Sequence, residues 1–143
     1  MTGYRAAGLV LAAAFLALAA GPATARPALR IAALRLVAAD GRTPAAAPYR
    51  RGERYRYVVD YLVAGAPRLR VTRAATIASP RGLVAIVRPP ATVSAPGRYR
   101  VSGGVRIGSG HPPGVYAIRY TIVARSPDGA SARRLRILRV RFV

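Results

Sequence analysis

Apolar and polar residues alternate one by one in several short stretches of this 143-residue sequence. Residues 54–63 place Tyr or Val at every second position, with arginines and an aspartate among the residues between them. Successive side chains of a strand point to opposite faces of a sheet, so this alternation is typical of strands with one buried face. No helical spacing with capping residues is found after residue 26. The sequence therefore predicts an all-β fold.

Glycines and prolines separate the alternating stretches and divide them into seven predicted strands. The predicted strands cover residues 29–39, 54–63, 68–78, 83–88, 98–107, 115–125 and 132–143. The turn Ser126-Pro127-Asp128-Gly129 has a clear physical basis, because Pro presets φ and Gly accepts a positive φ. Seven short strands with such turns predict a single antiparallel β-sandwich.

The last predicted strand changes its alternation halfway along. Two apolar sets alternate with arginines, first Leu135 and Ile137, then Leu138, Val140 and Phe142. The adjacent apolar residues Ile137 and Leu138 mark the change. We expect a β-bulge there, because one extra residue would keep both sets on the buried face.

Residues 1–25 have the organisation of a secretory signal peptide. Arg5 gives a positive start, residues 6–20 are uncharged and apolar, and Ala23-Thr24-Ala25 supplies the small residues that precede a cleavage site. The apolar run is shorter than the ~20 residues that span a membrane. We expect cleavage after Ala25, a mature domain of residues 26–143 without a transmembrane span, and a periplasmic or secreted location.

The sequence offers few groups for catalysis or metal binding. It has no Cys, no Lys, a single histidine and four acidic residues. These absences exclude disulfides, thiolate nucleophiles, Cys-ligated zinc and Schiff bases. A set of Ser109, His111 and Asp128 is formally available, but no oxyanion motif accompanies it. We therefore predict a non-enzymatic protein with no cofactor and no bound metal, in which His111 is a solvent-facing loop residue.

The charge is strongly basic, with 24 arginines against 4 acidic residues and a net charge of +20. Arginine forks bind carboxylate, phosphate and sulfate groups in pairs of hydrogen bonds. A second interpretation is that arginine fills exposed strand positions because the sequence lacks Lys, Asn and Gln. If the arginines bind a polyanion, the pairing of the last two strands predicts one continuous basic surface. Its residues would be Arg119, Arg134, Arg136, Arg139 and Arg141.

Tyr55, Tyr57 and Tyr61 share one face of a predicted strand. They could form an aromatic platform for sugars, or fill the core with their hydroxyls at its rim. Asp60 lies on the opposite face, among arginines, where we expect it to form an ion pair.

Two short motifs resemble those of the extracytoplasmic immunoglobulin-like modules of bacteria. Residues 49–55 are similar to the aromatic-x-x-Gly-Glu sequence that begins the second strand of such domains, and Pro113-Gly114-Val115-Tyr116 to the Pro-Gly-x-Tyr sequence before the sixth. The resemblance implies an immunoglobulin-like sandwich in which the hydroxyl of Tyr116 bonds to loop backbone, as in a tyrosine corner. The Cys pair and the Trp of antibody domains are absent.

These observations predict a binding or structural module that acts through protein contacts at the cell envelope. The alternative is a polyanion-binding protein that uses arginine-rich sheet faces. The expected partner is an envelope protein or an anionic surface polymer. We expect no physiological nucleic acid partner, because secretion removes the protein from nucleic acid.

Overall fold

The structure is a computed structural model that describes residues 26–143. The predicted signal peptide lies outside the described residues. Within the described part the chain forms eight strands and no helix, so none of it forms a helix that could cross a membrane. The strands are β1 (Ala28–Ala38), β2 (Arg54–Ala64), β3 (Leu69–Ser79), β4 (Gly82–Val87), β5 (Thr92–Ser94), β6 (Gly97–Arg106), β7 (Gly114–Arg125) and β8 (Ser131–Phe142).

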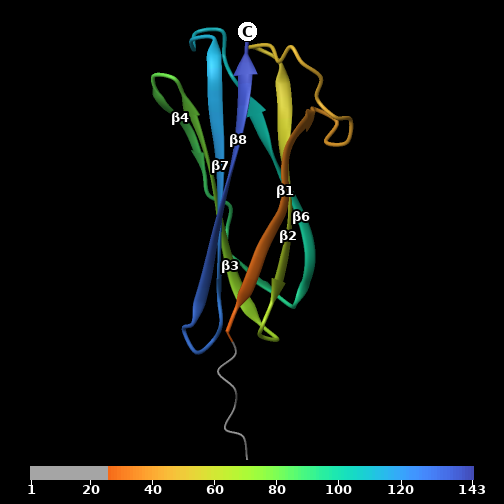
Figure 1. Ribbon diagram of the computed structural model, residues 1–143, viewed down its shortest axis with the longest axis vertical. Coiled ribbons are helices and arrows are strands. Elements are labelled where there is room, and N and C mark those ends of the chain that lie inside the picture. Colours follow the sequence, from red (N-terminus) through yellow and green to blue (C-terminus); the bar gives the residue numbers. More distant parts are fainter. Residues whose placement is uncertain (1–25) are drawn as a thin grey trace, which may run out of the picture.

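The strands form two antiparallel sheets (Figure 1). Sheet A has the order β1-β2-β6, and sheet B has the order β4-β3-β7-β8. The short strand β5 also pairs with β3, at its Leu69–Val71 end, whereas β4 pairs with Ala75–Ser79. All seven predicted strands are present, and β5 is an eighth that the sequence analysis placed in a loop. The prediction of an all-β, antiparallel fold is confirmed.

The inner faces of the two sheets supply one hydrophobic core. The alternation in β2 and β7 predicts their buried faces correctly. These faces comprise Tyr55, Tyr57, Val59, Tyr61 and Val63 in β2, and Tyr116, Ile118, Tyr120 and Ile122 in β7. The tyrosines of β2 therefore fill the core and do not form an exposed platform.

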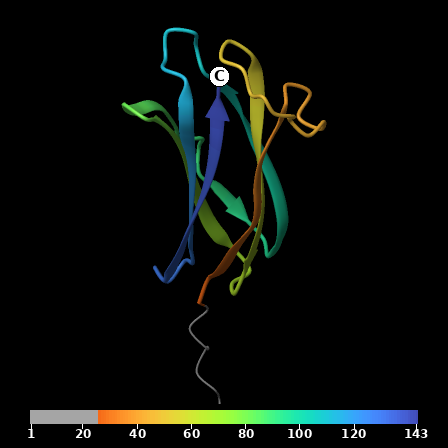
Figure 2. The same ribbon diagram turned by 45° about the horizontal axis from the view of Figure 1, so that its top comes forward.

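The segment between β1 and β2, residues 39–53, runs beside one edge of each sheet (Figure 2). Near its start, the carbonyl of Thr43 accepts a hydrogen bond of 2.8 Å from the amide of Ala38 in β1. Near its end, the carbonyl of Tyr49 accepts one of 2.9 Å from the amide of Val143, just after β8. This connection therefore supplies backbone partners to both edge strands.

The prediction of a β-bulge in the last strand is wrong. The β7–β8 register runs without a shift from the Arg125–Ser131 pair to the Gly114–Phe142 pair. The turn at residues 126–130 sets this register, and an antiparallel register fixes which side chains share a face. Turn geometry therefore overrides the local apolar pattern of β8.

Four side chains of β8 consequently face opposite to the prediction. Arg134 and Arg136 pair with Ile122 and Tyr120, whose side chains are buried, so both arginines lie on the inner face of sheet B. Leu135 and Ile137 lie on the outer face, and Leu135 is 50% exposed.

Candidate functional site

Arginines from all three strands of sheet A share its outer face. The strand registers place them there together with a single acidic residue, Asp60. This basic face comprises Arg30 and Arg35 of β1, Arg54, Arg56 and Asp60 of β2, and Arg98, Arg100 and Arg106 of β6. The sequence shows which arginines lie on each strand, but only the pairing of β2 with β6 brings these sets together.

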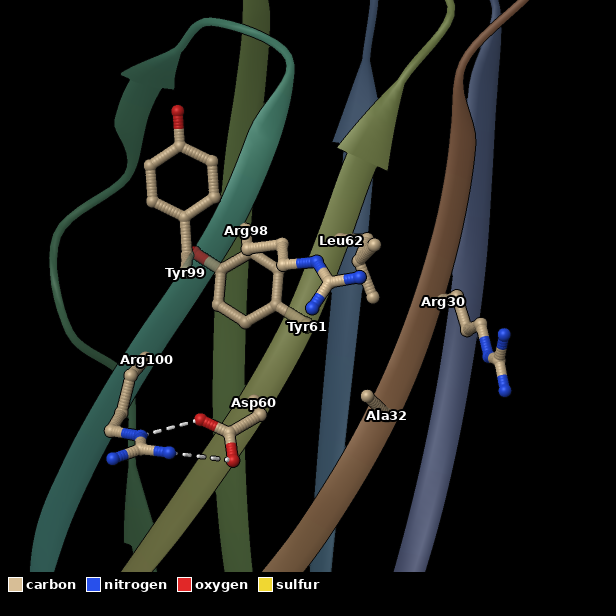
Figure 3. Close-up of a pocket in the computed structure, with 8 residues that line it drawn as sticks. All are labelled: Arg30, Ala32, Asp60, Tyr61, Leu62, Arg98, Tyr99 and Arg100. Atoms are coloured by element: carbon tan, nitrogen blue, oxygen red, sulfur yellow. Dashed lines mark hydrogen bonds and ion pairs between the residues drawn. The ribbon is translucent and has the colours of Figure 1, made fainter.

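Asp60 forms ion pairs with two of these arginines, as the sequence analysis expected. Arg100 donates from Nε to Oδ1 at 2.6 Å and from Nη2 to Oδ2 at 3.3 Å (Figure 3). Arg35 donates from Nη1 to Oδ2 at 2.7 Å. The hydrogen bonds from Arg100, and then the one from Arg35, hold the pKa of Asp60 below its ordinary value. The carboxylate therefore stays charged and orients two guanidinium groups on the face.

An open depression of ≈ 550 Å³ lies beside this carboxylate on the basic face. We call it the Asp60 depression (Figure 3). It is lined by Arg30, Ala32, Asp60, Tyr61, Leu62, Arg98, Tyr99 and Arg100. Because three arginines and one carboxylate line the depression, its net charge is positive and suits an oxyanion.

A second depression of ≈ 410 Å³ lies at the other end of the basic face. We call it the Arg106 depression; it is lined by Ala39, Arg54, Tyr55, Arg56, Gly104, Val105 and Arg106. Arg54 and Arg106 are direct cross-strand partners. Every ion pair found within residues 26–143 involves Asp60, so this arginine pair has no carboxylate to balance it. Like charges directly opposite each other destabilise a sheet unless an anion screens them.

The five arginines predicted to form one surface are divided by the fold. Arg119, Arg139 and Arg141 lie on the outer face of sheet B, at neighbouring positions of β7 and β8. Arg134 and Arg136 face the inner side, and Arg136 donates a hydrogen bond to the carbonyl of Ile31 in β1. The prediction of one continuous surface formed by all five arginines is therefore wrong.

The outer face of sheet B carries both arginines and exposed apolar side chains. Its arginines are Arg70, Arg119, Arg125, Arg133, Arg139 and Arg141. Leu83 and Ile86 of β4 and Leu135 of β8 lie on it and are between 48% and 61% exposed. Val93 of β5 and Val115 of β7 share the face and are also exposed. Both outer faces are therefore basic, but that of sheet B also exposes large apolar side chains, whereas that of sheet A holds the ion pairs of Asp60.

Arg73 is a residue whose placement the sequence analysis missed. It lies on the same face of β3 as the buried Val71 and Ala75, and its Nη2 lies 3.4 Å from the carbonyl oxygen of Pro90. Burial raises the pKa of the nearby Tyr57, and the positive charge of Arg73 opposes this rise. The alternation along β3 indicates this placement. Arg70 and Thr72 occupy the exposed positions, so position 73 between the next pair of neighbours faces inward.

Ser109, His111 and Asp128 do not come together. Ser109 and His111 lie in the exposed loop before β7, whereas Asp128 lies in the turn after it. At about 3.3 Å per residue, the length of β7 separates them by roughly 35 Å. His111 uses its backbone carbonyl to accept a hydrogen bond of 2.8 Å from Arg51. These three residues therefore cannot act as one catalytic set.

No family model and no curated protein matches the sequence. Two solved structures are similar in fold. One is the alkylpurine DNA glycosylase AlkC of Pseudomonas fluorescens, bound to DNA containing an abasic site analog. The match has 15% identity and a TM-score of 0.53, and it covers 80% of this chain and 30% of the AlkC chain. The ApaA protein of Bordetella pertussis matches 80% of this chain and 94% of its own, at 13% identity and a TM-score of 0.51. At such identities the likeness concerns the fold alone.

Proposed function

We propose that this protein is a non-catalytic binding module that holds an anionic polymer against the outer face of sheet A. One observation carries the proposal: seven arginines and one aspartate occupy a single sheet face. Surface positions rich in one sign of charge attract ligands of the opposite sign, and arginine forks suit carboxylate, sulfate and phosphate groups. The binding is therefore charge-driven and weakens as salt increases.

The proposal includes an immunoglobulin-like sandwich. The strand arrangement supports it, because β1, β2 and β6 correspond in order to strands A, B and E of such domains, and β3, β7 and β8 to strands C, F and G. The hydroxyl of Tyr116 also donates a hydrogen bond of 2.5 Å to the carbonyl of Pro112, four residues earlier, as a tyrosine corner does.

The proposed place of action is the periplasm or the cell exterior, where anionic surface polymers are available. The organisation of residues 1–25 supports export. Intact-mass measurement of the exported protein tests it, since the mature chain should begin at Arg26. A membrane-retained chain that keeps residues 1–25 would contradict this part of the proposal.

The binding surface is tested by salt elution from a heparin column. The variant with Arg30, Arg54, Arg98 and Arg106 changed to Ser removes four charges from the basic face and leaves the Asp60 ion pairs intact. The matched control changes Arg70, Arg119, Arg139 and Arg141 to Ser, which removes four charges from the outer face of sheet B.

We expect the basic-face variant to elute at much lower salt than the control. Equal elution of the two variants would show that net charge alone governs retention. A larger shift for the control would place the polyanion surface on sheet B.

A second candidate function is protein contact at the cell envelope through the outer face of sheet B. The exposed Leu83 and Ile86 of β4 favour it, because exposed apolar side chains that lie close together mark interaction surfaces. Leu135 is exposed on the same face, at the opposite edge strand β8. Substituting Ser for Leu83 and Ile86 should then abolish capture of an envelope partner in high salt, where charge-driven contacts are screened. Unchanged capture by this variant would exclude the face.

A further inference from the structure

The two depressions lie on the same sheet face but at opposite ends of it. Leu62 and Asp60 of β2 line the Asp60 depression, whereas Arg56 and Arg54 line the Arg106 depression. Their centres are about six residues apart along β2. At about 3.3 Å per residue, this separation is roughly 20 Å.

The arginines in the middle of the basic face already have hydrogen-bond partners. Val58 of β2 occupies it and is only 2% exposed, with Arg35 and Ser102 as its cross-strand partners. Arg35 is engaged by Asp60 at 2.7 Å, and Arg56 donates to the hydroxyl of Ser102 at 2.9 Å. The unengaged arginines are therefore concentrated in two groups, Arg30 with Arg98 and Arg54 with Arg106.

The side chains of this face narrow the class of ligand. Single-stranded nucleic acids bind by stacking bases on exposed aromatic rings. The registers place the tyrosines of β2 and β6 on the inner side of sheet A, and Tyr99, which is half-buried at the Asp60 depression, already stacks on Tyr61. Membrane-surface binding needs exposed large apolar side chains, and the apolar residues Leu62 and Val58 of this face are half-buried and buried. A polymer recognised by its charges alone fits the face best.

The arginine spacing favours an acidic polysaccharide. Arg98 and Arg100, like Arg54 and Arg56, are two residues apart on one strand, which corresponds to about 6.6 Å. This repeat matches one charge per sugar unit better than the denser charge of a polyphosphate chain. The polymer must also cross the middle of the face, where Arg35 and Arg56 already have partners, without losing contact at either end.

We propose that one acidic polysaccharide chain binds across both depressions at once. This inference rests on the proposed polyanion-binding function and adds the ligand class and a minimum ligand length. Linking two contacts makes the second one intramolecular, which raises the overall affinity without any new contact. The bound anions also screen the facing Arg54 and Arg106.

Size-defined alginate oligosaccharides, which carry one carboxylate per sugar unit, provide the test, with affinity measured by titration at constant low salt. Two variants each remove one pair of arginines: R30S/R98S at the Asp60 depression and R54S/R106S at the Arg106 depression. The control R119S/R139S removes the same charge from the outer face of sheet B. Chains shorter and longer than the roughly 20 Å separation are compared.

The parent and the control should show a step of about 100-fold in affinity once the oligosaccharide spans both depressions. Each basic-face variant should lose this step while it still binds short chains. A gradual rise with length that both variants retain would overturn two-point binding but keep the proposed function. An equal step with inorganic polyphosphate would overturn the polysaccharide assignment. Absence of binding at every length would overturn the proposed function as well.

Discussion

Arg136 donates a hydrogen bond from Nη1 to the backbone carbonyl oxygen of Ile31, 3.1 Å away in the opposite sheet. β1 is an edge strand, so the carbonyls on its free side have no ladder partner. β8 is the neighbouring edge strand of sheet B. The inward arginine therefore ties the two sheets together at their shared side.

Arg136→Ala should destabilise the fold by about 1 kcal/mol, because it removes one hydrogen bond to a partly buried carbonyl. Arg134→Ala is the control, since within residues 26–143 the side chain of Arg134 bonds only to the carbonyl of its neighbour Arg133. It should change the free energy of unfolding by less than about 0.5 kcal/mol. Urea denaturation measures both. Equal losses in the two variants would show that the contact with Ile31 has no effect on stability.

Tyr116→Phe should cost about 1 kcal/mol, because it removes the hydroxyl bonded to Pro112. Tyr116→Ala should cost roughly 3 kcal/mol or more, since the ring is fully buried and packs edge-on against Phe142 at 5.4 Å. Tyr99→Phe is the comparison, because Tyr99 makes the same kind of bond to Ala95 at an exposed site. A smaller loss for Tyr116→Phe than for Tyr99→Phe would contradict this prediction.

Gly103→Ala should destabilise the fold by roughly 1–3 kcal/mol. An added Cβ would overlap the hydroxyl and ring of Tyr57, which is buried and packs against Tyr120. Gly104→Ala is the matched control, because a Cβ there meets no atom within 4 Å. Thermal unfolding compares the two variants. Equal melting temperatures would mean that the Tyr57 ring moves aside without loss.

The ion pairs of Asp60 should stabilise the protein fully above about pH 4 and lose this effect at lower pH. Arg100 and Arg35 lower the pKa of Asp60 in the folded protein below its value of 3.8 in the unfolded chain. A lowered carboxyl pKa stabilises the fold above the unfolded value, and this contribution is lost as the pH falls through the folded pKa. Asp60→Asn should therefore be less stable than the parent at neutral pH, by about 1 kcal/mol or less because the pairs are exposed. The difference should vanish in acid. A difference that persists at low pH would assign the effect to packing.

The sequence predicts those parts of the fold that depend on residues close together in the chain. The alternation of Tyr55, Tyr57 and Tyr61 gives the buried face of β2 directly. The turn at residues 126–129 is also predicted, and Gly129 takes the expected positive φ of 92°. Both features depend on interactions within a few residues.

The failures concern relationships between strands. Leu135 and Ile137 are predicted as buried from their apolar character, but the register with β7 places them outside. The basic face forms because Arg54 pairs with Arg106, a partner 52 positions later in the chain. β5 escapes prediction because three residues are too few to show an alternation.

The segment of residues 39–53 has a consequence for the protein's behaviour in concentrated solution. An uncovered strand edge can recruit a strand of another molecule, which is a common start of aggregation. Because one connection supplies backbone partners to both β1 and β8, a single proteolytic cut within it would release two adjacent edges together. We therefore expect cleavage of this connection to increase the tendency of the protein to aggregate.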